Sequence, residues 1–316
     1  MTKVVVVGGG IAGIYFAYRL LQLVDARVVL IEPKENHEFV IGIPMAFGGL
    51  IDFDQLLFPL SQLRRVIHVR DNAKALDGKC VRLASMPSVC GDYVVLAPGA
   101  YKLGSVEYWN VEGAKKLWNN VEKAQSIHFI VNELNPVIGF QEIAYAIKTR
   151  FPEKRVSIHL VYVADDYRFL LNPWMTWAEA KGIEISEDPP QHRPGDLYIS
   201  VPSVRPHPLV ADLEPDPATM ETQLERVYLI GDAALLKLGL PPIGWGALWQ
   251  ASLAAQAVAS EITRGYIEVE PDIWSSMSDP EKFKNWLTYR MTSGTPLIHL
   301  KGLYDTWANK VVKTLS

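Results

Sequence analysis

The chain has 316 residues, of which 49% are hydrophobic and 21% are charged, with a formal net charge of −4. This length suggests about two domains of an ordinary globular protein, and the acidic balance argues against a nucleic-acid partner. The first motif starts at residue 3, and no run reaches the roughly 18 apolar residues that span a bilayer. We therefore expect a cytoplasmic protein without a signal peptide.

The first 32 residues contain the clearest motif of the chain. Four consecutive valines at 4–7 predict a buried strand, and the glycine-rich sequence 8–13 follows directly. An amphipathic helix is predicted at 14–23 and a second strand at 27–31, which ends on Glu32. The order of strand, G-x-G-x-x-G, helix, strand and acid is typical of a dinucleotide site. The alternative is a structural glycine turn that binds nothing.

Each part of this motif has a physical reason. Gly8 permits the tight turn, Gly10 lets the backbone approach a pyrophosphate, and Gly13 lets the helix pack close to the strand. The start of the helix offers N–H groups and a partial positive charge to phosphates. Glu32 lies nineteen residues after Gly13, where its carboxylate can accept hydrogen bonds from a ribose diol.

Downstream of this unit the pattern predicts mostly short elements. We expect a loop-rich stretch at 33–49, a helix at about 53–63, and strands at 65–69, 79–84 and 93–96, with a turn at 85–88 between the last two. A helix at 113–124 precedes a second strand–helix–strand unit, at 127–131, 142–150 and 156–163. The remaining elements are a short strand at 197–201 inside the proline-rich stretch 188–208, a strand at 227–230, a helix at 244–263 and two amphipathic stretches in 271–316.

Three further segments distinguish a flavoprotein from a nicotinamide enzyme. Residues 92–100 resemble the D-x-L-V-x-A-T-G stretch of flavoproteins with two dinucleotide-binding domains, with Pro98 in place of the threonine. Residues 227–233 resemble the second FAD signature of these proteins, in which the residue corresponding to Asp232 holds the ribityl chain. Residues 241–250 resemble the helix start that lies at the flavin pyrimidine, although the family lysine is absent.

The segment 32–63 narrows the resemblance to one branch of the pyridine nucleotide-disulfide oxidoreductase superfamily. It is similar to the sulfide:quinone oxidoreductases and type II NADH dehydrogenases, which carry an aromatic residue, a proline and A-x-G at similar places. The resemblance implies an α/β fold with two Rossmann-like domains, the FAD domain containing an inserted NAD-type domain, and a short C-terminal helical tail. The expected boundaries are 1–102 and 220–270 for the FAD domain, 103–219 for the inserted domain and 271–316 for the tail.

The resemblance also implies FAD as the cofactor and a set of site residues. The expected FAD contacts are Gly8, Gly10, Ile11, Ala12, Gly13, Glu32, Pro33, Ala73, Ala97, Pro98, Gly99, Gly231, Asp232, Ile243 and Gly244. Pro44 and Glu142 are the candidate catalytic residues, and Glu142 matches a family glutamate near the flavin and quinone. The alternative for Glu142 is an exposed acid in the first turn of a helix, where the macrodipole favours it.

The cysteines depart from the family pattern. Disulfide reductases place a redox pair shortly after the first unit, and this chain has no cysteine at 40–50. Sulfide:quinone oxidoreductases carry cysteines in the middle domain, and here none follows Cys90. Cys80 and Cys90 are expected on neighbouring strands, either as small apolar core residues or as a structural cross-strand pair. Sulfide oxidation by the cysteine mechanism is therefore not expected, and the seven histidines show no metal-ligand spacing.

The second nucleotide motif is degenerate. Where relatives that use NADH read G-G-G-x-x-G-x-E, residues 135–142 retain only Gly139 and Glu142. Val137 and Ile138 place side chains where a pyrophosphate needs bare backbone, and Pro136 lacks an N–H donor. We expect NAD(P)H to bind weakly or not at all.

The tail combines an apolar stripe with basic residues. On a helix over 297–315, one face would carry Leu300, Leu303, Tyr304, Trp307, Val311 and Leu315. Residues 281–316 have a net charge of +4, which leaves −8 for the rest of the chain. A segment of this kind fits peripheral contact with the cytoplasmic face of a membrane. The alternative is packing against the body of the protein, a homodimer partner or another subunit.

These observations leave two functions open. The first is an FAD-dependent oxidoreductase that passes electrons from a small donor through the flavin to a quinone or another acceptor. The second is a flavin-binding electron carrier or assembly subunit without turnover of its own.

Overall fold

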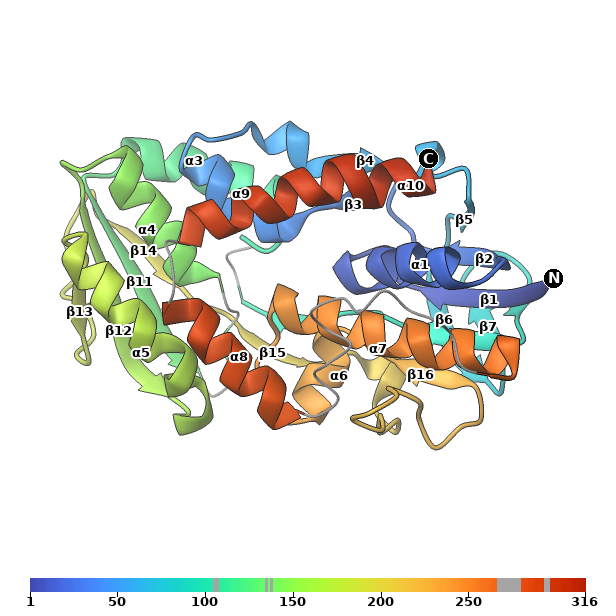
Figure 1. Ribbon diagram of the computed structural model, residues 1–316. Coiled ribbons are helices and arrows are strands. Elements are labelled where there is room, and N and C mark those ends of the chain that lie inside the picture. The colour runs from blue at the N-terminus through green and yellow to red at the C-terminus, as the bar shows by residue number, and fades with distance from the viewer. Residues whose placement is uncertain (105–107, 134–135, 137–138, 266–279, 293–295) are drawn as a thin grey trace.

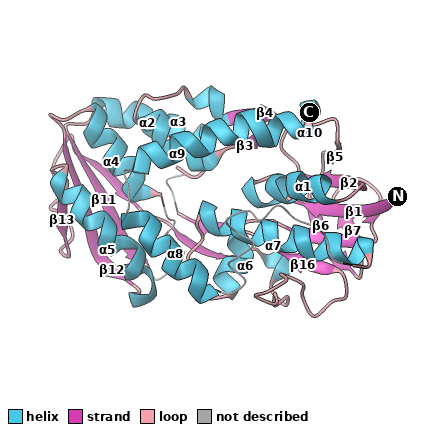
Figure 2. Cartoon of the chain, viewed as in Figure 1, coloured by secondary structure: helices cyan, strands magenta, loops and turns pink. Residues whose placement is uncertain are grey.

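The computed structural model describes residues 1–104, 108–133, 136, 139–265, 280–292 and 296–316. Two parallel sheets lie at opposite ends of the molecule, with helices packed around each (Figures 1 and 2). The first sheet has the order β16-β9-β1-β2-β5, and every pairing in it is parallel. Its strands are β1 (Thr2–Val7), β2 (Ala26–Ile31), β5 (Val66–Val69), β9 (Tyr93–Leu96) and β16 (Val227–Leu229).

The valines of β1 explain how the first sheet is covered on both faces. Val4 and Val6 belong to the core that includes the helices α1 (Ile11–Leu23) and α7 (Gly244–Thr263). Val5 and Val7 belong to the core shared with the antiparallel sheet of β6 (Ala73–Asp77), β7 (Cys80–Leu83) and β8 (Val89–Cys90). Successive side chains of a strand point to opposite faces, so a strand covered on both sides is a continuous apolar run.

The second sheet has the order β13-β12-β11-β14 and is also parallel. Its strands are β11 (Ser126–Glu133), β12 (Arg155–Val163), β13 (Glu184–Ser186) and β14 (Leu197–Ser200), and the helices around it are α3 (Val111–Lys123), α4 (Phe140–Arg150) and α5 (Asp165–Ala180). An antiparallel pair, β10 (Ala100–Leu103) with β15 (Ser203–Pro206), lies where the chain enters and leaves this half.

The other described elements are short strands, helices and turns. They are β3 (Asn36–Glu38), β4 (Leu57–Pro59), α2 (Ile43–Phe47), α6 (Asp232–Lys237), α8 (Pro280–Thr292), α9 (Pro296–Thr306), a π-helical segment (Trp307–Val312), α10 (Lys313–Leu315) and short 3₁₀ turns at Val40–Gly42, Phe53–Leu56, Leu60–Gln62 and Pro208–Val210.

Two local predictions are wrong. The expected helix at 53–63 is instead a 3₁₀ turn, the strand β4 and a second 3₁₀ turn. Pro59 has no N–H for a continuous helix, and β4 pairs antiparallel with β3, which lies well before it in the chain. The turn at 85–88 does not lead directly into β9, because β8 intervenes and pairs with β7.

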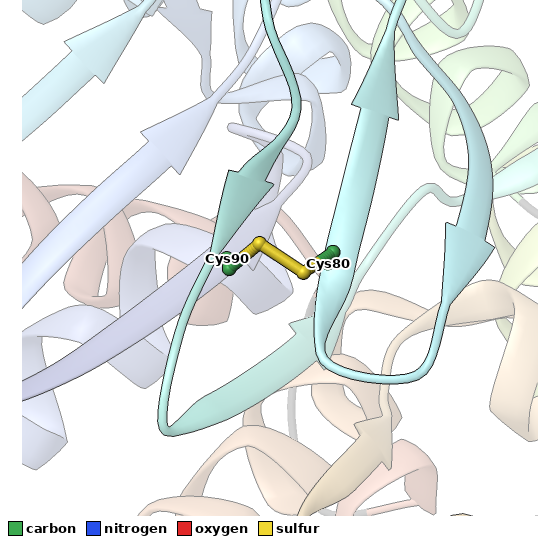
Figure 3. The surroundings of a disulfide bond; sticks show 2 residues. All are labelled: Cys80 and Cys90. Atoms are coloured by element: carbon green, nitrogen blue, oxygen red, sulfur yellow. A yellow bond between two sulfur atoms is a disulfide. The ribbon is translucent and has the colours of Figure 1, made fainter.

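The two cysteines form a disulfide between neighbouring strands (Figure 3). Cys80 of β7 is the register partner of Cys90 of β8, and the two Cα atoms are 3.9 Å apart. Of the two alternatives that the sequence left open, the structure shows the cross-strand pair. The bridge ties the small antiparallel sheet that covers one face of the first sheet.

The tail packs on the body of the protein. Trp307, Val311 and Leu315 are each no more than 1% exposed, and Leu300 is buried as well. The Trp307 ring packs on two aromatic rings of the body. Its centroid lies 6.1 Å from the ring centroid of Tyr15 and 5.3 Å from that of Phe39. Of the alternatives that the sequence left open for this stripe, the structure shows packing against the body of the protein, since its apolar side chains are occupied by intramolecular contacts. Within the described residues, no helix combines the length and apolarity needed to span a bilayer.

Candidate functional site

A cavity of about 530 Å³ lies where strands of the first sheet end. Val7 of β1, Ile31 of β2 and Ala97 after β9 line it, and Gly231 lies just beyond the end of β16. Ligands of open α/β sheets bind at this carboxyl edge. The wall continues to Gly139 and Glu142 at the start of α4, so segments from both halves of the molecule enclose one space.

Nearly all residues expected at the site line this cavity. The wall includes Gly8, Gly10, Ile11, Ala12, Glu32, Pro33, Pro44, Ala73, Ala97, Pro98, Gly99, Glu142, Gly231, Asp232, Ile243 and Gly244. Gly13 is the exception, because it packs beneath the loop, where a Cβ would lie 2.0 Å from Gly8 O. The structure thus brings the candidates together, and their individual roles stay predictions.

The glycine loop has room for a phosphate group. Gly8 has φ +103°, and a Cβ there would lie 2.1 Å from Ala97 O, so only glycine fits this turn. No atom lies within 4 Å of the Cβ position of Gly10, which faces open space. Helix α1 has Gly10 as its N-cap residue, with no side-chain cap and no acidic residue in its first turn. This helix start therefore offers its N–H groups to an anion.

Glu32 is held beside the loop by the backbone. Its Oε2 accepts a hydrogen bond from Gly9 N at 2.7 Å, and its Oε1 accepts one from Lys34 N at 3.0 Å. A carboxylate has about four lone-pair sites. The orientation is thus fixed while acceptor capacity for a ribose hydroxyl remains.

The second signature forms the opposite wall. Gly231 has φ +80°, and its N–H donates to Oε1 of the fully buried Gln250 at 2.8 Å. Asp232 follows as the first residue of α6, with its Oδ2 3.7 Å from Lys102 Nζ. Lys102 therefore places a cation in the same cavity as Asp232. No sequence motif indicated this lysine.

Glu142 is the most perturbed acid of the cavity wall. It lies in the first turn of α4, just after Gly139, which has φ +110°. Its Oε2 is shielded from solvent and has no hydrogen-bond partner among the described residues. Burial raises the pKa of Glu142 to about 7. The alternative of an exposed helix-start acid is therefore not what the structure shows.

Much of the cavity wall outside the glycine motifs is apolar. The apolar lining residues outside the glycine motifs include Ile41, Ile43, Pro44, Tyr108, Ile143, Trp245 and Leu300. Tyr108 is 2% exposed, and burial together with the Glu142 charge raises the pKa of its hydroxyl well above the usual value. Leu300 comes from the tail, so helix α9 contributes to the site.

Sequence reasoning missed several wall residues. His207, which no sequence motif indicated, is half-buried, lines the cavity and accepts a hydrogen bond from Leu209 N at 3.1 Å. Burial lowers the pKa of His207. Lys102, Tyr108, Trp245 and Leu300 have no motif of their own, and only the tertiary fold brings them to the wall.

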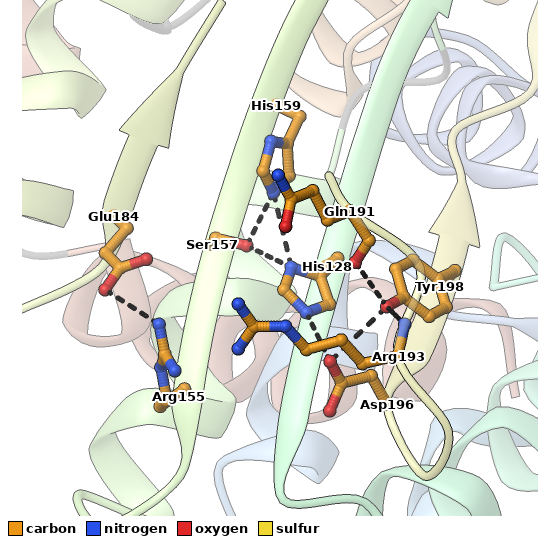
Figure 4. A network of polar contacts seen from close by, with 9 residues as sticks. All are labelled: His128, Arg155, Ser157, His159, Glu184, Gln191, Arg193, Asp196 and Tyr198. Carbon is orange, nitrogen blue, oxygen red and sulfur yellow. Dashed lines mark hydrogen bonds and ion pairs between the residues drawn. The ribbon is translucent and has the colours of Figure 1, made fainter. Parts of the chain in front are cut away.

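A polar network on the second sheet is separate from the cavity (Figure 4). His128, Ser157 and His159 are joined by contacts of 2.7–3.3 Å, and Asp196 lies 3.3 Å from His128 Nε2. Tyr198 donates to Gln191 O, which ties the loop before β14 to the same face. Ser157 is 4% exposed, so the network suits a structural clamp better than a nucleophile. Within the described part of the chain, no group of three or more potential metal ligands occurs.

The parallel sheets, the glycine turns and the shared cavity define a dinucleotide-binding protein with two Rossmann-like halves. The model of the pyridine nucleotide-disulphide oxidoreductase family matches residues 2–160, half of the chain. The chain belongs to this family, and FAD is its cofactor. The open cradle at Gly10, the uncapped start of α1 and the oriented Glu32 fit that cofactor.

Solved structures share the fold over most of the chain. The sulfide:quinone oxidoreductase of the hyperthermophilic bacterium Aquifex aeolicus has a TM-score of 0.69 and 16% identity, and the match covers 99% of this chain and 92% of that one. The NADH:rubredoxin oxidoreductase of Clostridium acetobutylicum has a TM-score of 0.61 and 18% identity, with 86% and 78% covered. An NAD-dependent persulfide reductase of A. fulgidus has a TM-score of 0.61 and 20% identity, with 81% and 59% covered. Among curated proteins, none matches the chain significantly.

Proposed function

We propose that this FAD-dependent oxidoreductase passes two electrons from a small donor to a quinone or a similar apolar acceptor. FAD supplies the capacity to accept and release those electrons. The observation that carries the proposal is Glu142, a carboxyl of the cavity wall with one oxygen shielded from solvent, which can hold a proton near neutral pH.

Reduction of a quinone needs protons as well as electrons. A carboxyl whose pKa lies near the working pH is both protonated often enough and acidic enough to deliver one. Glu142 meets this condition because burial raises its pKa to about 7. The apolar residues Ile41, Ile143 and Trp245 would exclude water and favour a flat apolar acceptor.

The cysteines support a donor reaction without a thiol relay. The chain has two cysteines, and both are engaged in the disulfide between β7 and β8. Neither lines the cavity. The proposed donor is therefore one that transfers electrons directly.

The degenerate second motif favours a donor other than NAD(P)H. The side chains on which this expectation depends, Val137 and Ile138, lie outside the described residues. Pro136 is described and removes one N–H donor from that turn. NADH should therefore reduce the protein poorly.

Anoxic mixing experiments test this function. The purified yellow protein is mixed with NADH or sulfide, or reduced photochemically, and the reduced form is then mixed with a water-soluble quinone analogue. We expect slow bleaching by NADH and reoxidation by quinone that is faster than reoxidation by oxygen. Glu142→Gln should slow the quinone step about 10²-fold, as expected for loss of a proton donor, whereas the exposed acid variant Glu122→Gln should not change it.

The possible outcomes separate the candidates. Reduction by micromolar NADH at about 10 per second, an ordinary enzymatic rate, would overturn the prediction about the donor. Equal reoxidation rates for Glu142→Gln and the wild type would remove the proposed proton donor. A flavin that no small donor or quinone affects would instead indicate the electron carrier or assembly subunit.

A further inference from the structure

We infer that His37 is a positioning residue for the glycine loop, and that Trp307 of the tail holds its ring in place. The inference rests on FAD as the cofactor and is independent of the proposed acceptor. His37 is not among the residues that line the cavity, and no sequence motif indicated it. Its role follows from one hydrogen bond and from the packing around its ring.

The His37 ring fixes the carbonyl of Gly9. His37 Nδ1 lies 2.7 Å from Gly9 O, and the side chain is 1% exposed. A carbonyl oxygen only accepts, so Nδ1 carries the hydrogen and Nε2 does not. Nε2 is buried without a hydrogen-bond partner among the described residues, which agrees with a neutral ring.

This contact determines where the next N–H points. In a planar trans peptide the C=O and the following N–H point in opposite directions. Because Gly9 O is directed at His37, the N–H of Gly10 is directed away from it. Gly10 lines the cavity, and the space around its Cβ position is open. His37 thus sets the orientation of the first N–H donor at the start of α1.

The peptide groups on both sides of Gly9 are held. Gly9 N donates to Glu32 Oε2 at 2.7 Å, while Gly9 O accepts from His37. An anion site works best when its donors are already oriented, because orienting them on binding costs free energy. Glu32 and His37 together supply this orientation before the dinucleotide arrives.

The tail keeps the His37 ring in its position. The Trp307 ring stacks on the His37 ring, with centroids 5.3 Å apart and planes 28° apart. The centroid of the Phe58 ring lies 6.0 Å from the centroid of the His37 ring. Burial lowers the pKa of His37 to about 4, so the ring stays neutral at physiological pH. The C-terminal segment therefore acts on the dinucleotide loop through one aromatic contact.

The test compares two replacements of His37 in the full-length protein. His37→Phe keeps a ring on Trp307 but loses the donor, whereas the side-chain amide of His37→Asn retains a donor near the position of Nδ1. The dissociation constants of FAD and of ADP are measured by fluorescence quenching and competition, and the unfolding midpoint of each cofactor-free variant is recorded. Phe58→Leu is the packing control, because it changes the same aromatic cluster without touching Gly9.

We expect His37→Phe to raise the dissociation constants of both FAD and ADP about three- to ten-fold, the range for one neutral hydrogen bond. His37→Asn and Phe58→Leu should stay within about two-fold of the wild type. Equal affinity in His37→Phe and the wild type would overturn the inference. So would an equal loss in His37→Asn and His37→Phe, or a loss in Phe58→Leu as large as in His37→Phe, because the role would then be packing alone. If His37→Phe does not fold, His37→Leu, which also lacks a donor, takes its place in the same comparison.

Discussion

The three glycines of the first motif serve different purposes at the scale of single residues. Gly8 and Gly13 have backbone oxygens about 2 Å from the positions of their missing Cβ atoms, whereas Gly10 has open space. Gly10 also has φ −76°, which any residue adopts. The fold therefore requires Gly8 and Gly13, while Gly10 is needed for the ligand.

This difference gives the first prediction. Gly10→Val should abolish FAD binding and leave the free energy of unfolding of the cofactor-free protein within about 0.5 kcal/mol of the wild type. Gly13→Ala should destabilise the fold itself, since backbone atoms cannot move aside cheaply. Chemical denaturation and flavin absorbance after reconstitution measure the two effects. A Gly10→Val protein that binds FAD normally would contradict the assignment of the loop.

Glu142 gives a prediction for pH dependence. Its pKa is about 7 in the folded protein, against 4.5 ordinarily, so the folded state keeps a proton that the unfolded state releases in this window. Stability from this group is complete below pH 4.5 and falls as the pH rises to 7. The Gln variant cannot ionise. Glu142→Gln should therefore be more stable than the wild type at pH 8, by up to about 3 kcal/mol.

Urea denaturation of the cofactor-free proteins at pH 4.5 and pH 8 checks this. The stability difference between the variant and the wild type should grow from the lower to the higher pH. A difference that is the same at both pH values would mean that folding does not raise the pKa of Glu142, and the proposed proton donor would lose its support.

Cavity residues that belong to a sequence motif could be predicted from the sequence, whereas cavity residues outside any motif could not. The spacing from Gly8 to Glu32 reflects one continuous strand–helix–strand unit, so it can be recognised locally. Tyr108 and Leu300 reach the cavity from distant parts of the chain. Their position depends on tertiary packing, which leaves no local pattern.

At the scale of elements, the strongest periodicities gave correct predictions. The helix at 244–263 is observed as α7 with the same bounds, and the second strand–helix–strand unit corresponds to β11, α4 and β12. The prediction of a helix at 53–63 was wrong because a short apolar run fits a helix and a strand equally well. The strands β3 and β8, of three and two residues, had no periodicity to detect.

The tail shows that an amphipathic pattern predicts an apolar face without specifying its partner. The apolar face was identified correctly, but a sequence cannot tell whether such a face meets lipid or protein. The apolar face of the tail packs against α1 and β3, which Trp307 contacts through Tyr15 and His37. The exposed face holds basic residues such as Lys310 and Lys313.

This packing predicts the effect of removing the indole. Trp307→Ala should lower the free energy of unfolding by about 3–5 kcal/mol, as expected for a large buried aromatic residue. Lys310→Ala, one turn away and exposed, should change it by less than about 0.5 kcal/mol. Equilibrium denaturation gives both values. Equal, small effects would mean that the tail is not part of the folded body in solution.

A buried lysine stabilises the junction between α3 and β12. Lys154 is 6% exposed, and its Nζ donates to the carbonyls of Val121, Glu122 and Ala124 at the end of α3. These carbonyls have no helical partner, and the cation also complements the negative end of the helix. Lys154→Met keeps the length of the side chain but leaves the carbonyls unsatisfied. It should cost about 1–3 kcal/mol in the free energy of unfolding, which thermal denaturation against the exposed Lys123→Met control would reveal.

At the scale of the whole molecule, the family and cofactor could be inferred from four ordered segments, whereas the donor could not. The motifs that indicate FAD are glycine turns and helix starts, whose residues follow one another in the sequence. A donor or acceptor is recognised by the side chains of a wall assembled from many segments. Such a wall can change its chemistry while the fold stays the same.

Residues from Val7 to Leu300 line the cavity, so its wall draws on segments along nearly the whole length of the described chain. A ligand that binds only the native state shifts the folding equilibrium by mass action, by about 2.7 kcal/mol at a free concentration one hundred times its dissociation constant. FAD supply should thus determine how much of this protein survives in a cell. A substitution far from the flavin should weaken its retention whenever it loosens any of these segments, which makes bound flavin a reporter of correct assembly.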